Sequence, residues 1–243
     1  MSAELLINVT PSESRVALIE NGILQEIHVE RHTKRGLVGN IYRGKVSRVL
    51  PGMQAAFVDI GLEKAAFLHA SDIVIHNEIA EEVSASHIQK QDIRELVRDG
   101  QDIVVQVVKD PIGTKGARLT TDITIPSRYL VFMPSVTHVG VSQRIEEEVE
   151  RERLKSLVQE FCDENGGFIL RTAAEGVGKN ELQSDAAFLR RLWDKIQSRM
   201  KKRKSNVLYE DLPLARRVLR DFVGTELDRI RIDSKLSFNE LHQ

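Results

Sequence analysis

Two phenylalanines fall on the polar faces of two neighbouring predicted strands. Successive side chains of a strand point to opposite faces, so in the stretch AAFVDI the ring of Phe57 shares its face with Asp59. In the stretch AAFLHA, Phe67 shares its face with His69 in the same way. Two aromatic rings on the solvent side of adjacent strands form a platform for nucleobases, and each stacked base contributes about 1–3 kcal/mol whatever its identity. Alternation alone equally allows both rings to be core residues of a twisted sheet.

Basic residues near this pair could contact phosphate groups. Arg43, Lys45 and Arg48 lie in the strand that precedes Phe57, and Lys115 lies in the turn PIGTKG, whose glycines allow two backbone segments to approach closely. The whole chain carries 35 basic and 36 acidic residues, so no global positive field attracts nucleic acid. A site for single-stranded RNA must therefore be a local patch.

An arginine and a threonine follow an apolar predicted strand in the stretch GGFILRTAAEG. A guanidinium fork beside a hydroxyl matches a terminal phosphate, because planar donors bind two of its oxygens at once. Arg171 and Thr172 are therefore candidates for a phosphate pocket. A surface arginine after a strand is the more common outcome of so short a motif, and the local sequence leaves that alternative open.

A basic run, Arg199–Lys204, ends a long predicted helix. Cations at a helix C-terminus complement the helix dipole, and a solvated basic helix end is the usual explanation of such a run. Contact with RNA is the second interpretation.

The sequence does not indicate a metal site, a disulfide or a membrane span. Cys162 is the only cysteine, which excludes an intramolecular disulfide, and His28, His32, His76 and His87 have no metal-ligand spacing. We therefore expect no metal site and no cofactor in this chain. The N-terminal residues lack the pattern of a secretory signal, and no apolar run reaches about 18–20 residues. A reducing, cytoplasmic setting without a membrane span is expected.

The elements that position these residues indicate an α+β chain of several domains. Three short strands are predicted within residues 4–30, and closely spaced β-rich runs between 38 and 121 predict a small barrel. A polar segment, 76–100, interrupts the barrel and is predicted to be a loop followed by a short helix. Further strands and helices follow it, with helices predicted within 146–166, 185–204 and 214–228 and a final strand at 229–233.

Three motifs within the predicted barrel resemble the S1-type RNA-binding domain, an oligonucleotide-binding barrel. They are Gly44-Lys-Val, Ala56-Phe-Val-Asp-Ile-Gly61 and Ala66-Phe-Leu-His-Ala-Ser-Asp72, and both their order and their spacing agree with that domain. The resemblance implies that Phe57, Phe67 and Lys115 occupy RNA-contact positions.

A longer resemblance, from Glu4 to Asp233, is to the ribonuclease E/G family, and it is carried by ELLINVT, RVALIENG, NIYRGKV, AAFVDIG, TKGARLTT, YLVFMP, ILRTAAEGVG and RDF. In that family the region after the barrel senses the 5′ monophosphate of RNA. The resemblance places Arg171 and Thr172 at phosphate-binding positions and gives Val131 a further contact. Ser127 stands where the longer family member has glycine, at the position of a backbone contact.

The same resemblance implies the domain organisation. Residues 1–37 and 214–243 are expected to be two parts of one truncated ribonuclease H-like subdomain. The barrel, 38–121, and the 5′ sensor, 122–213, are expected to be inserted between them.

The family's members are single-strand-specific endoribonucleases of rRNA processing and mRNA decay, which cut RNA in a later DNase I-like domain with Mg²⁺ and pair through a cysteine-containing zinc link. This sequence ends at Gln243, before that domain, so we expect recognition of single-stranded RNA with a 5′ monophosphate but no cleavage. No catalytic role is assigned to Asp59, Asp72, Asp122 or Asp233. The parent enzyme is expected to be a homo-oligomer with Mg²⁺ as its cofactor. The alternative is a self-contained, non-enzymatic RNA-binding protein built on the same barrel, which the length of the natural gene would distinguish.

Overall fold

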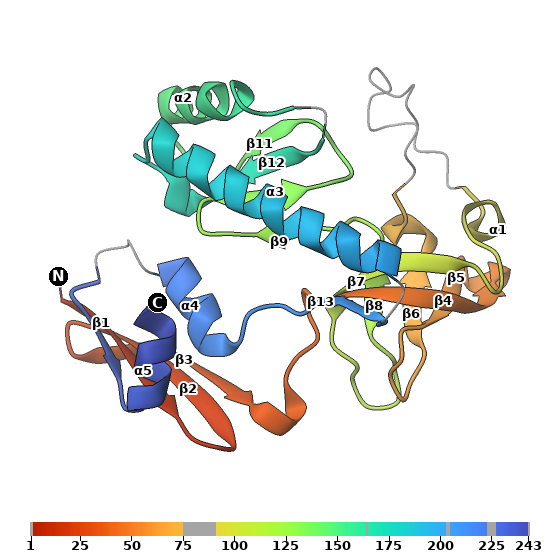
Figure 1. The fold of residues 1–243 in the computed structure, drawn as a ribbon, viewed down its shortest axis with the longest axis horizontal. Coiled ribbons are helices and arrows are strands. Elements are labelled where there is room, and N and C mark those ends of the chain that lie inside the picture. The colour runs from red at the N-terminus through yellow and green to blue at the C-terminus, as the bar shows by residue number, and fades with distance from the viewer. Residues whose placement is uncertain (1, 75–90, 164, 203–204, 223–226, 243) are drawn as a thin grey trace. The chain divides into compact units, whose positions relative to one another are not determined.

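A computed structural model describes residues 2–74, 91–163, 165–202, 205–222 and 227–242 (Figure 1). The chain divides into two compact units, one formed by Met1–Gly36 with Leu212–Gln243 and the other by Leu37–Asp211. Each unit has its own sheets and its own buried core, and each is described separately.

The first unit is a four-stranded sheet with the order β14-β1-β2-β3. Its strands are β1 (Ala3–Val9), β2 (Glu13–Glu20), β3 (Ile23–Arg31) and β14 (Arg229–Ile232), and β14 runs parallel to β1. Asn21 and Gly22 both have positive φ, 51° and 78°, which is the conformation that a two-residue Asn-Gly hairpin turn requires. One sheet face, with Leu5, Ile7 and Val16, packs against helix α4 (Leu214–Phe222). The three strands predicted at the N-terminus are confirmed.

The second unit begins with the predicted small barrel, which has five strands. Its strands follow the order β4-β5-β6-β8-β7, and a further pairing between β4 and β7 closes the barrel. They are β4 (Ile41–Leu50), β5 (Ala55–Asp59), β6 (Ala66–His69), β7 (Asp102–Lys109) and β8 (Arg118–Thr120). Short apolar side chains alternate into the barrel, among them Val58, Ala66, Leu68 and Leu119. Of the segment predicted as a loop and a short helix, residues 76–90 lie outside the described residues and the helix is α1 (Ile93–Leu96).

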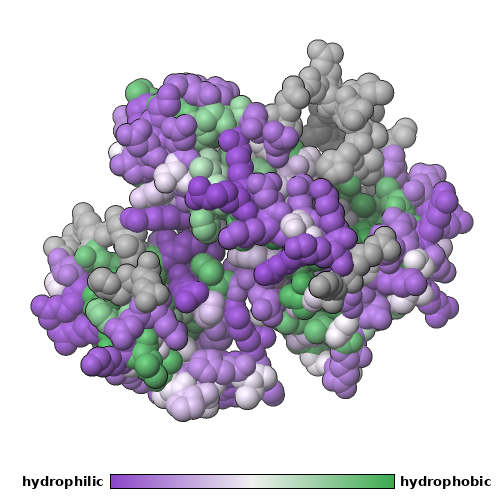
Figure 2. Space-filling model, viewed as in Figure 1, coloured by the Kyte–Doolittle hydropathy of each residue, from purple (hydrophilic) through white to green (hydrophobic). Residues whose placement is uncertain are grey.

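A second sheet in this unit carries the candidate phosphate residues. Its order is β11-β12-β10-β9, formed by β9 (Ile125–Pro126), β10 (Leu130–Met133), β11 (Val139–Val141) and β12 (Gly167–Leu170). Helices α2 (Glu148–Gln159) and α3 (Lys179–Lys202) pack against it over a core that includes Phe132, Phe168, Leu154 and Leu189. The exposed side of α3 is largely hydrophilic, as expected of an amphipathic helix that covers a sheet (Figure 2).

Three elements differ from the prediction. Helix α3 begins at Lys179, six residues before the predicted start at residue 185, because Leu182 is buried one turn ahead of Ala186 and extends its apolar face. Strand β13 (Val207–Tyr209) and helix α5 (Lys235–His242) were not predicted. Strand β13 is antiparallel to β4 and adds a sixth strand to the barrel sheet. Among the described residues, no helix is both long and apolar enough to cross a membrane.

Candidate nucleic-acid interface

The two phenylalanines predicted to form a platform lie directly opposite each other in the barrel. Phe57 of β5 is the cross-strand partner of Phe67 of β6, and their ring centroids are 6.2 Å apart with the ring planes at 69°. Both rings are partly exposed, whereas their neighbours Ala56, Val58 and Leu68 point into the barrel core. The alternation of these strands thus points the rings outward, and the alternative of a core position is wrong.

The rings line a cavity of about 810 Å³. Lys115, in the connection between β7 and β8, lines the same cavity, so the structure brings together three of the residues predicted to contact RNA. The complete lining is Met53, Phe57, Lys64, Ala65, Phe67, Lys109, Asp110, Ile112, Thr114, Lys115, Gly116 and Arg118. Aromatic faces beside several cations match the composition of single-strand binding sites.

The three basic residues of β4 lie in different places. Lys45 and Arg48 are exposed and are the cross-strand partners of Asp59 and Phe57, so both stand beside the aromatic face. The guanidinium of Arg43 instead donates a hydrogen bond to the carbonyl of Met200, near the end of α3. Arg43 therefore joins the barrel to α3 and does not line the cavity, because the first half of β4 pairs with β13, the strand that follows α3 in the chain.

An ion pair that the sequence did not suggest borders the platform. Arg118, the cross-strand partner of Phe67, donates two hydrogen bonds to the carboxylate of Asp72, from Nε at 2.9 Å and from Nη2 at 3.1 Å. The carboxylate raises the pKa of the Arg118 guanidinium, so this cation stays charged in the cavity wall. Asp72 thereby has a structural partner.

Arg171, at the end of β12, contacts the turn that precedes β10. Its Nη1 donates to the carbonyl of Ser127 at 2.6 Å and lies 3.4 Å from that of Arg128, while its backbone N–H donates to Tyr129. Thr172 is exposed, and its hydroxyl is 3.5 Å from that of Ser142. The predicted pair is therefore anchored to neighbouring segments of the second sheet.

The two remaining predicted phosphate contacts differ in their surroundings. Val131 is partly buried in β10, between its cross-strand partners Pro126 and Ile169. Ser127 is only 4% exposed, and its N–H, hydroxyl and carbonyl all have partners within the protein. We conclude that Ser127 acts as a structural residue of the turn, because every polar group it could offer to a phosphate is engaged.

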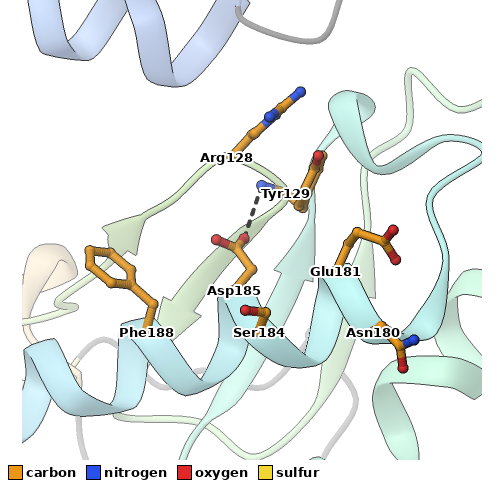
Figure 3. A pocket seen from close by; sticks show the side chains of 7 residues that line it. All are labelled: Arg128, Tyr129, Asn180, Glu181, Ser184, Asp185 and Phe188. Atoms are coloured by element: carbon orange, nitrogen blue, oxygen red, sulfur yellow. Dashed lines mark hydrogen bonds between the residues drawn. The ribbon is translucent and has the colours of Figure 1, made fainter. Parts of the chain in front are cut away.

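Asp185 of α3 organises this turn, and sequence reasoning missed it. Its Oδ2 accepts hydrogen bonds from the N–H groups of Tyr129 and Leu130, at 3.0 and 3.1 Å, and lies 2.5 Å from the Ser127 hydroxyl. Figure 3 shows this carboxylate pointing at the turn from the helix, with Ser184 and Glu181 beside it. These residues line an open pocket of about 480 Å³. No local signal identifies Asp185, since its partners lie 55 or more residues earlier.

The basic run at the end of α3 is partly tied down. Arg199 donates from Nη1 to the carbonyl of Leu208 at 2.9 Å, whereas Lys201 and Lys202 are exposed. The last two residues of the run, 203 and 204, lie outside the described residues. Arg199 thus connects α3 to β13.

Carboxylates do not gather into a cluster in the part of the chain that the structure describes. Within those residues, no group of three or more His, Cys, Asp or Glu side chains could hold a metal ion. Asp59 accepts a hydrogen bond from Gly61, and Asp233 accepts bonds from Asn8 and Val9. His76 and His87 are outside the described residues.

Comparisons with known proteins agree with this geometry. Residues 37–119 match the family model described as "S1 RNA binding domain", and residues 124–243 match the one described as "Ribonuclease E/G family". The sequence is 68% identical over 242 residues, 99% of this chain, to ribonuclease G of Escherichia coli K12 and 63% identical over its full 243 residues to ribonuclease G of Haemophilus influenzae. The chain belongs to the ribonuclease E/G family. It spans 50% of the length of both relatives.

A more distant family member, ribonuclease E of a Nostoc species, is 37% identical over 229 residues, which is 93% of this chain and 32% of that protein. The S1 match covers four barrel strands and all but the last residue of β8, and the ribonuclease E/G match covers the second sheet with its helices and continues to the end of the chain. An S1 domain is an RNA-binding domain, so the barrel of this family member is an RNA-binding module.

Proposed function

We propose that this chain is the RNA-binding and 5′-end-sensing half of a single-strand-specific endoribonuclease. The observation that carries the proposal is the pair formed by Phe57 and Phe67, two partly exposed rings in one cavity with Lys115. Stacking on rings binds unpaired bases of any sequence, and the nearby cations bind the backbone that links them. Duplex RNA cannot offer its base faces in this way, so single strands are preferred.

The second sheet is proposed to recognise a 5′ monophosphate through Arg171 and Thr172. An exposed hydroxyl adjacent to a guanidinium supports this assignment, as does the match of this region to the ribonuclease E/G family. Val131 is proposed to line the same phosphate-binding pocket as Arg171 and Thr172. The contacts of Arg171 with the turn at Ser127 would hold the guanidinium in a fixed orientation, which suits recognition of one terminal group.

Cleavage is proposed for the part of the family's length that this chain does not span. Asp72 is bound by Arg118 and Asp233 by Asn8, so we assign neither carboxylate to a magnesium site. Mg²⁺ would supply charge stabilisation and an activated water where paired acidic residues hold it. Roles in rRNA processing and mRNA decay, and assembly as a homo-oligomer, belong to the same proposal.

The test compares two RNA ends on one oligonucleotide. We expect the chain to bind a single-stranded decamer with a 5′ monophosphate more tightly than the same decamer with a 5′ hydroxyl, as measured by fluorescence anisotropy. A stand-alone RNA-binding protein with only the barrel would bind both equally. Equal affinities would contradict the 5′ sensor, and failure to bind either decamer would contradict the platform.

A further inference from the structure

Two large apolar side chains stand exposed at the rim of the aromatic cavity. Met53 is 59% exposed and Ile112 is 75% exposed, yet both line the same cavity as Phe57 and Phe67. They come from different connections: Met53 ends the short helix Pro51–Met53 before β5, and Ile112 lies between β7 and β8. Exposed apolar groups concentrated around one cavity indicate a surface that a ligand covers.

Ile112 is held on a tight hairpin that also carries Lys115. Their backbones exchange two hydrogen bonds, at 3.2 and 3.0 Å, across a two-residue loop. The first loop residue, Gly113, has φ +56°, which is typical of the hairpin turn that places glycine there. Directly paired residues of a hairpin project to the same face. The apolar side chain of Ile112 and the cation of Lys115 therefore flank one another.

The hairpin is fixed to the body of the barrel at two points. At its tip, Lys64 donates from Nζ to the carbonyl of Gly113 at 2.6 Å. At its base, a Cβ on Gly116 would stand 1.9 Å from the carbonyl oxygen of Ala65, so only glycine allows this approach. Both contacts come from the segment just before β6, the strand that carries Phe67. The distance between Ile112 and the aromatic rings is thus set by residues 64 and 65.

We propose that Met53 and Ile112 contact the sides of the nucleobase that stacks on Phe57 and Phe67, and that Lys64 is a positioning residue for Ile112. The inference rests on the RNA-binding function proposed above and adds base-contacting residues to that site. The cavity volume, about 810 Å³, lies within the range of roughly 300–1,000 Å³ found for small-ligand sites and admits a nucleotide.

The charges of the lining favour a nucleic acid over an apolar ligand. Lys109 and Lys115 line the cavity in addition to Lys64, which holds the hairpin, and Arg118, which pairs with Asp72, and the only carboxylate in the lining is that of Asp110. That carboxylate accepts a hydrogen bond from the N–H of Leu37 and so has a structural role. An apolar interior with a cationic rim matches a base whose phosphates lie outside.

The test compares a 5′-hydroxyl uridine hexamer with an abasic ribose-phosphate hexamer of equal length, each bound to the full chain. Ile112→Ala and Met53→Ala are each expected to weaken binding of the uridine hexamer about five-fold, from the apolar area that the base no longer covers, and to leave the abasic hexamer unaffected. Val149→Ala, at a residue 77% exposed on α2, is the matched control and should change neither affinity.

Three outcomes separate the proposals. If Phe67→Ala binds the uridine hexamer as the parent chain does, the platform itself is wrong. If Phe67→Ala weakens binding while Ile112→Ala and Met53→Ala do not, only the present inference is overturned. Equal losses for the base-bearing and abasic hexamers would also overturn it, because these residues would then act on the backbone.

The role of Lys64 has its own readout. Lys64→Met should weaken binding of the uridine hexamer in the parent chain but add little in the Ile112→Ala chain, because its effect passes through Ile112. The dependence of affinity on salt should stay unchanged. A slope of log affinity against log salt reduced by about 0.7 would instead show that Lys64 contacts a phosphate directly, and would overturn its positioning role.

Discussion

The carboxylate of Glu150 accepts a hydrogen bond from the backbone N–H of Gly176 at 2.8 Å. This bond ties α2 to the loop that follows Thr172. The same carboxylate accepts two hydrogen bonds from the guanidinium of Arg153, one turn further along the helix, at 2.6 and 2.7 Å. Arg153 in turn donates to the carbonyl of Val177 at 3.1 Å, so helix and loop are connected twice.

This connection predicts that the stability of the chain is sensitive to acid. The Arg153 side chain, followed by the Gly176 N–H, lowers the pKa of Glu150 from 4.5 to about 2. A pKa lower in the folded than in the unfolded chain stabilises the fold above about pH 4.5, and that contribution is lost as the pH falls toward about 2. Because solvent screens the Glu150–Arg153 ion pair, we expect it to contribute about 1 kcal/mol to the free energy of unfolding.

Urea denaturation at a series of pH values checks this expectation. Glu150→Gln should be less stable than the parent chain at neutral pH and should approach it below about pH 3. Glu148→Gln, at a carboxylate that is 77% exposed, is the matched control. A constant difference between Glu150→Gln and the parent across the whole range would show that protonation of Glu150 plays no part.

Replacing Arg171 should remove discrimination between RNA ends. Charge-assisted hydrogen bonds contribute about 1.5–3 kcal/mol each, so Arg171→Ala should abolish most of the preference for a 5′ monophosphate over a 5′ hydroxyl. Arg171→Lys should restore little of it, because an ammonium lacks the fork geometry. The affinity ratio of the two decamers is the measurement. A ratio that Arg171→Ala leaves unchanged would mean that Arg171 is only a structural surface charge.

Replacing Asp185 should disturb the same site indirectly. Asp185→Ala leaves the N–H groups of Tyr129 and Leu130 without their acceptor, and we expect a loss of about 2–4 kcal/mol in unfolding free energy. The turn contacted by Arg171 should then lose its fixed geometry, lowering the preference for a 5′ monophosphate. Thermal unfolding tests the loss of stability, and the affinity ratio of the two decamers tests the loss of end preference. Ser184→Ala is the neighbouring control. An unchanged melting temperature would contradict the structural role.

Removing one platform ring should affect binding more than folding. Phe67→Ala is expected to weaken binding of single-stranded RNA by about 1–3 kcal/mol. A core phenylalanine would instead lose about 3–5 kcal/mol of stability on the same change. Phe188→Ala, at an exposed aromatic residue of α3, controls for general loss of aromatic surface. Melting temperature and affinity measured on the same samples separate the two effects, and a large fall in melting temperature with normal binding by the folded fraction would contradict the platform.

The local sequence was sufficient to predict those elements whose interaction partners lie nearby in the chain. The alternation around Phe57 and Phe67 predicted both strands and put each ring on the same face as a polar residue, because cross-strand neighbours in a hairpin lie near each other in sequence. It left open whether that face is solvent or core, and the structure decides this by showing both rings partly exposed. The Asn21-Gly22 turn was predictable for the same reason, since its two residues dictate their own backbone conformation.

Features defined by distant partners could not be predicted. Val207–Tyr209 is a strand only because β4, more than 150 residues earlier, offers it an edge. Arg43 was expected beside the platform, but the carbonyl that binds it belongs to Met200. Ser127 was expected to offer a backbone contact, and only the positions of Asp185 and Arg171 show that its polar groups are already used. The residue pattern of one segment does not indicate which distant residues it will contact.

The strand β13 has a consequence for dividing this chain into pieces. The segment that follows α3 returns to the barrel, where Asn206 accepts a hydrogen bond from the N–H of Arg43 and Val207 pairs with Tyr42. A protein cut at the boundary between the two family matches would lose that strand and leave the first half of β4 with an open edge. Unpaired strand edges invite association with other chains. An excised barrel should therefore tend to self-associate. A chain that continues to residue 211 keeps β13, which covers this edge of β4.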